Sequence, residues 1–93
     1  MAVDIVIVSY NTRELLRACL DSVRRFGLGE DAACIVVDNA STDDSARMVA
    51  EAFPDVRLIA LDGNIGFGAA NNRGLAGLRA EFVLFLNPDA ELT

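Results

Sequence analysis

Hydrogen-bonding side chains follow each of the four apolar runs in this sequence of 93 residues. The residues are Ser9, Tyr10 and Asn11, then Asp38 and Asn39, then Asp62, and finally Asn87 and Asp89. A carboxylate can accept a hydrogen bond from a base or from a ribose hydroxyl, and another can hold Mg²⁺ or Mn²⁺, which then bridges phosphates. A nucleoside diphosphate would use both kinds of contact, whereas turn and capping chemistry would explain any one of these groups alone.

A glycine-rich segment after the third apolar run has two interpretations. Gly63, Gly66 and Gly68 are spaced G-x-x-G-x-G, so the dinucleotide-binding fingerprint and the P-loop pattern are both absent. One interpretation is a turn followed by a helix that packs closely on a sheet through Gly74 and Gly77. The other is close approach of the backbone to a ligand, and the polar side chains nearby favour it. These side chains belong to Asn71, Asn72 and Arg73.

The apolar runs predict four strands that alternate with three helices. The strands are expected at residues 3–8, 34–37, 56–61 and 82–86, without the alternation of half-buried strands. Such strands joined by helices predict an α/β fold of four mainly parallel strands with helices on both faces, in three layers. Open sheets of this kind bind ligands beyond the carboxyl ends of their strands, which is where the polar groups fall.

Capping residues and apolar spacing predict the helices. Asn11 and Glu14 have the spacing of a capping box for the first helix. Its apolar stripe is Leu15, Leu16, Cys19, Leu20, Val23 and Phe26. Ser41 is expected to cap the second helix, with Asp43 and Asp44 in its first turn. The inner face of that helix is Met48, Val49, Ala52 and Phe53, with Pro54 as its stop. The third helix is expected to end near Arg79.

Charge and composition limit the class of protein. The net charge of −6, from 14 acidic and 8 basic residues, argues against a nucleic-acid-binding surface. With Cys19, Cys34 and no histidine, we expect no zinc site and two buried thiols in a reducing compartment. No apolar run has the roughly 18–20 residues of a membrane span, and the N-terminus lacks a basic signal region. These features predict a cytoplasmic location, peripheral to the inner face of the membrane if a longer parent protein attaches there.

Four segments match a known family when they are taken in order. They are VIVSYN at residues 6–11, VVDNASTDDS at 36–45, NIGFGAANNRGL at 64–75 and FVLFLNPDAEL at 82–92. The second is similar to a V-D-(N/D)-x-S-x-D-x-(S/T) element, the third to N-x-G-x-x-x-A-x-N-x-G, and the fourth to a strand that leads into a D-x-D motif. Together they resemble the N-terminal, Rossmann-like half of family 2 glycosyltransferases with the GT-A fold. The resemblance implies that residues 1–93 are the part that binds a nucleotide-diphospho-sugar.

The resemblance also implies roles for the candidate residues. Those that would contact the nucleotide are Ser9, Tyr10, Asn11, Asp38, Asn39, Asn72, Arg73 and Asn87. Asp38 would accept the N3–H of uracil or thymine, and Asn87 would bind a ribose hydroxyl. Asp89 would hold the Mg²⁺ or Mn²⁺ that bridges the two phosphates.

Two departures from the family pattern qualify these roles. Asn87 stands where D-x-D has its first aspartate, so Asp89 is expected to hold the metal largely alone. The N-P-D form is similar to a rhamnosyltransferase-like branch, which makes a UDP- or dTDP-sugar the expected donor for an unknown sugar or lipid-linked acceptor. In the family the acceptor site and catalytic base follow the metal motif, so we expect a donor-binding half that is inactive alone.

A non-catalytic α/β module that self-associates is the alternative. The fourth strand would lie at an edge of the sheet, and an exposed apolar edge invites strand pairing between chains. Such pairing would produce a homodimer.

Overall fold

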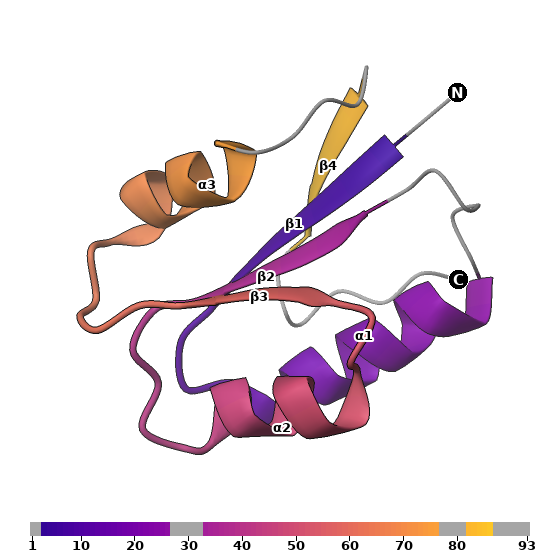
Figure 1. Ribbon diagram of the computed structural model, residues 1–93, viewed down its shortest axis with the longest axis horizontal. Helices are drawn as coiled ribbons and strands as arrows, with labels where there is room; N and C mark the ends of the chain where they lie inside the picture. The colour runs from indigo at the N-terminus through magenta and orange to yellow at the C-terminus, as the bar shows by residue number, and fades with distance from the viewer. Residues whose placement is uncertain (1–2, 27–32, 77–81, 87–93) are drawn as a thin grey trace.

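A computed structural model describes residues 3–26, 33–76 and 82–86 as one sheet with helices against it (Figure 1). The strands are β1 (Val3–Ser9), β2 (Cys34–Asp38), β3 (Arg57–Ala60) and β4 (Phe82–Leu86). The helices are α1 (Arg13–Phe26), α2 (Ser45–Ala52) and α3 (Phe67–Leu75). The predicted order of strands and helices is confirmed, although β3 and α3 are shorter than expected.

All strand pairs are parallel, and the order across the sheet is β3-β2-β1-β4. The register places Ile5 of β1 beside Cys34 of β2 on one side and Leu84 of β4 on the other. The helices α1 and α2 lie on one face of the sheet and α3 lies on the other (Figure 1). The three-layer prediction is therefore confirmed, and the strands end together at one edge.

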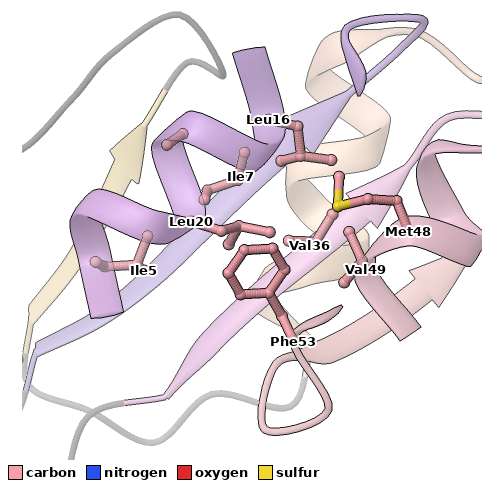
Figure 2. Close-up of a cluster of buried hydrophobic side chains, with 9 residues drawn as sticks. Ile5, Ile7, Leu16, Leu20, Val36, Met48, Val49 and Phe53 are labelled. Carbon is pink, nitrogen blue, oxygen red and sulfur yellow. The ribbon is translucent and has the colours of Figure 1, made fainter. Parts of the chain in front are cut away.

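The side chains of β1 enter two separate apolar cores. One core, which Figure 2 shows, joins β1 and β2 to α1 and α2 through Ile5, Ile7, Leu16, Leu20, Val36, Met48, Val49 and Phe53. The other lies under α3 and contains Val8, Ile35, Val37 and Ala70. Each large aliphatic side chain that is fully buried contributes about 1.5–3 kcal/mol. Burial on both faces is why the first strand is a continuous apolar run rather than an alternating one.

Gly74 lets α3 lie directly on the sheet. A Cβ atom at this position would lie 2.6 Å from Cγ1 of Val6 and 3.3 Å from Cγ2 of Val37. No side chain larger than hydrogen fits there without displacing β1 or the helix. The close-packing interpretation is therefore confirmed for Gly74, while Gly77 lies outside the described residues.

One member of the predicted apolar stripe is wrong. Leu16, Cys19 and Leu20 are buried, but Leu15 is 49% exposed. Successive residues of a helix are separated by about 100°. Leu15 therefore points only about 40° away from the buried Cys19. It lies one turn nearer the start of α1, where its side chain reaches solvent.

Cys19 and Cys34 are thiols rather than a disulfide, and the prediction that both are buried is wrong for Cys34. Cys19 is fully buried, and Cys34 is partly buried at the start of β2. Burial raises the pKa of the Cys34 thiol to about 12, and the nearby Cys19 adds to the rise. Within the residues described, no helix is long and apolar enough to cross a membrane.

Candidate functional site

Three loops lie at the carboxyl edge of the sheet (Figure 1). They are residues 10–12 after β1, residues 39–44 after β2 and residues 61–66 after β3. The strand ladder continues into them, because Asn39 N donates to the Ser9 carbonyl at 2.8 Å and Leu61 N donates to the Asp38 carbonyl at 2.9 Å. The second and third loops therefore leave the sheet from fixed positions.

Hydrogen bonds join the first loop to the second. The amide of Asn11 donates to Oγ of Ser41 at 2.9 Å, and the amide of Thr42 donates to Oδ1 of Asn11 at 2.8 Å. The amide of Arg13, the first residue of α1, donates to Oδ2 of Asp43 at 3.0 Å. The second loop thus supplies the acceptor that the start of α1 needs.

These contacts show that both predicted helix caps are wrong. Oδ1 of Asn11 accepts hydrogen bonds from the second loop instead of forming a capping box with Glu14. The helix α2 begins at Ser45, so Ser41 lies too early to cap it. Asp44 precedes the helix and makes no side-chain cap hydrogen bond. The capping groups pair between loops rather than within each helix, which local spacing does not reveal.

The inter-loop role of Ser41, Thr42 and Asp43 was not predicted from the sequence. The run of hydroxyl and carboxyl groups at residues 41–45 was the available signal. Such short polar side chains bond to nearby backbone groups, but the sequence does not specify which backbone.

Asp43 is the most heavily bonded carboxylate of the second loop. Oδ1 accepts hydrogen bonds from the Ser45 hydroxyl and, at 3.1 Å, from the Ser45 amide, while Oδ2 accepts from Arg13. Burial alone raises the pKa of Asp43, but these hydrogen bonds outweigh it and hold the pKa below its ordinary value of 3.8. Asp43 is therefore a charged clamp between α1 and α2.

Asp38 ends β2 with its carboxylate held on both oxygens. The Ser41 amide donates to Oδ2 at 3.1 Å and the Ser41 hydroxyl donates to Oδ1 at 2.6 Å. The residue is 3% exposed. A carboxylate has about four lone-pair positions, so these two bonds leave capacity for another donor.

Asn39 holds the third loop. Its residue is 3% exposed, and its Oδ1 accepts a hydrogen bond from the Ile65 amide at 2.9 Å. Gly66 follows with φ of 87°, a conformation that favours glycine, and its amide donates to Oδ1 of Asn64. The glycine there serves the turn into α3.

Three residues of the first two loops have left-handed backbone conformations without being glycine. They are Asn11 with φ of 51°, Ala40 with φ of 66° and Asp44 with φ of 65°. Asn and Asp tolerate this region, whereas alanine does not do so readily. Strain of this kind concentrates at functional sites, where surrounding bonds enforce it.

The predicted nucleotide contacts after β1 and β2 divide into exposed and bracing groups. Tyr10 is 48% exposed, whereas Ser9 is fully buried and its hydroxyl forms a hydrogen bond of 3.0 Å with Oγ1 of Thr12. Asn39 is buried too and is bonded to Ile65. Tyr10 is therefore presented to solvent, while Ser9 and Asn39 hold the loops.

Asn72 and Arg73 lie on the exposed side of α3. Ala70 and Gly74 of the same helix face the sheet. The helix starts at Phe67, beside the carboxyl edge of the sheet that is the candidate site, here called the candidate edge. It rises about 1.5 Å per residue. The two side chains thus start more than one turn from the strand ends, and no hydrogen bond between described residues links them to Asp38.

The sequence comparison decides the family. A model of "Glycosyl transferase family 2" matches residues 4–93. This chain belongs to glycosyl transferase family 2. The matched residues include the four-stranded parallel sheet and the polar loops described above.

The chain is also similar to known proteins and to solved structures. The chain is 34% identical over 92 residues to the teichoic acid poly(glycerol phosphate) polymerase of Staphylococcus epidermidis, covering 95% of this chain and 13% of that protein. It matches S. aureus TarS 1–349 in complex with UDP-GlcNAc with a TM-score of 0.82 and 27% identity, covering 96% of this chain and 27% of that one. It also matches a Pyrobaculum calidifontis mannosyltransferase in complex with GDP-Man and Mn²⁺, with a TM-score of 0.81 and 28% identity, covering 96% and 28%. The chain thus spans less than a third of each of these proteins.

The predicted metal site lies after the fourth strand, near the C-terminal end of the matched residues. Asn87 and Asp89 lie outside the described residues. Within the ranges that are described, no three His, Cys, Asp or Glu side chains are grouped to hold a metal ion. The carboxylates of Asp38 and Asp43 instead accept hydrogen bonds from hydroxyl and amide donors of their own loop and of α1.

Proposed function

We propose that residues 1–93 form the donor-binding part of a family 2 glycosyltransferase, with the nucleoside diphosphate at the carboxyl edge of the sheet. The observation that carries this proposal is the carboxylate of Asp38, 3% exposed and held on both oxygens by Ser41. A hydrogen bond to a fixed, sheltered carboxylate is stronger than one made in water. The N3–H of uracil or thymine is a hydrogen-bond donor that can meet this carboxylate. The sugar donor would therefore be a UDP- or dTDP-sugar.

Other groups would complete the nucleotide contacts. The exposed ring of Tyr10 offers a surface for the base, and the side-chain NH₂ of Asn11 can donate to the ribose. Asn72 and Arg73 would meet the diphosphate side, where a guanidinium suits phosphate oxygens. Asn87 would bind a ribose hydroxyl.

Asp89 would hold Mg²⁺ or Mn²⁺, since a carboxylate after the fourth strand is the oxygen ligand these ions prefer. When bound, the ion would neutralise charge on the departing nucleoside diphosphate. The mannosyltransferase complex with Mn²⁺ supports this part of the proposal. Asp89→Ala should abolish the effect of Mn²⁺ on nucleotide affinity without abolishing binding in its absence.

The sugar is a separate proposal. The N-P-D sequence at residues 87–89 favours a dTDP-activated sugar such as rhamnose, whereas the similar structures hold UDP-GlcNAc and GDP-Man. Competition among dTDP-rhamnose, UDP-GlcNAc and GDP-mannose for the chain decides between them. Displacement of bound nucleotide by dTDP-rhamnose at the lowest concentration supports the dTDP donor, and preference for either of the others rejects it.

Nucleotide titration with the 93-residue chain tests the main proposal. Amide NMR signals are followed while UDP or dTDP is added, with and without Mg²⁺ as the diamagnetic ion, and calorimetry repeats the series with Mn²⁺. The expected result is a set of saturable shifts in residues 10–12 and 38–42, with higher affinity when metal is present. Absence of saturable shifts with either nucleotide would reject the proposal.

Asp38 needs a careful variant because it also holds the second loop. Asp38→Ala removes the acceptor for both the amide and the hydroxyl of Ser41. Asp38→Asn keeps one oxygen acceptor but removes the charge, so it perturbs the loop less. The expected result is that Asp38→Asn binds UDP more weakly than the wild type does. Its free energy of unfolding should stay within about 1 kcal/mol of the wild-type value.

Self-association of a non-catalytic module is the second candidate, and the position of β4 favours it. In the described part of the chain β4 pairs only with β1, so its other edge carries no strand. Phe85 of β4 is 46% exposed. Light scattering over a concentration series separates the candidates: an edge-paired dimer supports the module, whereas a monomer that binds nucleotide supports the donor site.

A further inference from the structure

The direction of the hydrogen bonds around Ser41 follows from the groups involved. The amide of Asn11 can only donate, so Oγ of Ser41 accepts from it at 2.9 Å. The single hydrogen of that hydroxyl is then free to point at Oδ1 of Asp38, 2.6 Å away. This distance is typical of a hydroxyl that donates to a carboxylate.

Ser41 fixes the plane of the Asp38 carboxylate. One residue supplies a donor to each oxygen, its amide to Oδ2 at 3.1 Å and its hydroxyl to Oδ1. The terminal torsion of an aspartate is otherwise broad. The remaining lone pairs of Asp38 therefore point in directions that Ser41 sets.

The hydroxyl of Ser41 is not needed merely to join the loops. Thr42 N to Asn11 Oδ1 at 2.8 Å and Arg13 N to Asp43 Oδ2 at 3.0 Å already connect them. What the hydroxyl adds is the contact with Asp38. It also links that carboxylate to the backbone of Asn11, which is held in a left-handed conformation.

We propose that Ser41 is a positioning residue for base recognition: its hydroxyl and amide aim the Asp38 carboxylate at the N3–H of the nucleotide base. The inference rests on the proposed nucleotide function and names the residue that makes Asp38 selective. It assigns to Ser41 no contact with the nucleotide itself.

The test compares a nucleotide with its N3-methylated analogue. Methylation removes the hydrogen that Asp38 would accept and places a methyl group against that carboxylate, so the ratio of the two dissociation constants reports on the contact between N3 and Asp38. UDP and dTDP are each paired with their N3-methyl counterparts, and the pair with the tighter unmethylated member is used. The wild-type chain should favour the unmethylated nucleotide by about tenfold, as expected for one hydrogen bond to a charged group.

Removal of the Ser41 hydroxyl should reduce this preference. In Ser41→Ala the ratio should fall by roughly three- to tenfold, toward one, and Ser41→Thr, which keeps a hydroxyl, should restore it. A purely structural role would weaken both ligands equally and leave the ratio unchanged, which would overturn the inference. Thr42→Val is the matched control, because it removes a hydroxyl from the same loop without touching Asp38, and its ratio should equal that of the wild type.

The outcomes separate this inference from the proposed function. If the wild-type chain binds neither nucleotide, the proposed function fails and this inference fails with it. If it binds and discriminates, but Ser41→Ala discriminates equally well, only the positioning role fails. Ser41→Gly, which keeps the amide but not the hydroxyl, replaces Ser41→Ala if that variant does not fold, and the same loss of preference is required of it.

Discussion

Oδ1 of Asn39 accepts a hydrogen bond from the amide of Ile65 at 2.9 Å, so the end of β2 holds the loop that leads into α3. Asn39 is buried, and Asp38 beside it is bonded to the second loop. Two adjacent side chains thus hold two different loops. The end of β2 is the point from which the candidate edge is organised.

Removal of this contact should destabilise the fold. Asn39→Ala leaves the Ile65 amide without its side-chain acceptor, which should cost about 1–3 kcal/mol of unfolding free energy. Asn39→Asp retains an oxygen in the same place and should recover part of the loss. Urea denaturation of the three proteins measures both differences, and equal stability of the alanine variant and the wild type would contradict the prediction.

Gly74 and Gly68 offer a matched pair of substitutions in α3. Gly74→Ala places a methyl 2.6 Å from Val6 Cγ1 and should cost about 1–3 kcal/mol through overpacking. Around Gly68 no atom lies within 4 Å of the added Cβ, so Gly68→Ala should stabilise by about 0.4–1 kcal/mol. Opposite shifts of the thermal midpoint are expected. A stabilised Gly74→Ala variant would show that α3 does not press on β1.

Replacement of Ala40 by glycine should stabilise the fold. Its φ of 66° costs an L-residue about 1–2 kcal/mol, of which Ala40→Gly should recover up to about 1 kcal/mol after the added freedom of the unfolded chain. For a domain of this size that is about 4–8 °C in the thermal midpoint. Ala50→Gly, on the exposed side of α2, is the control and should instead lower the midpoint, since helical glycine costs about 1 kcal/mol.

Asp43 should make stability depend on pH in the acid range. Hydrogen bonds hold its folded pKa below the ordinary value of 3.8, so the unfolded chain takes up a proton first as pH falls. The stabilisation is fully present above the unfolded value and is lost as pH falls through the lower folded value. The wild type should therefore exceed Asp43→Asn in urea stability at about pH 7, and the gap should narrow at about pH 3. A gap that stays constant between the two would contradict this.

The sequence predicts the strands and helices well because buried faces require apolar residues at regular positions. The apolar runs of β1 and β2 reflect two covered faces, and the inner face of α2, with Met48, Val49 and Phe53, is buried as expected. Asp4 is the exception within the first run. It is 5% exposed and its Oδ1 accepts a hydrogen bond from the Ala33 amide, which no local pattern indicates.

The site is less predictable, because its contacts join residues that are distant in the chain. The position of Asp38 as a carboxylate at the end of a strand follows from the sequence. Its hydrogen bonds with Ser41 do not, because the sequence is equally consistent with Ser41 as a helix cap. Asn11 shows the same limit: its side chain bonds to Thr42 rather than to its own helix. Local rules specify which groups seek partners, and tertiary structure decides which partners they find.

The hydrogen bonds that join the three loops connect residues 26 to 31 positions apart in the chain. Helices can form locally and early, but these bonds require β1 and β2 to have paired, and closing such loops carries an entropic cost. The candidate edge should therefore assemble late in folding, after the sheet. A nucleotide that binds only this edge would recognise the completed domain and draw the folding equilibrium toward it.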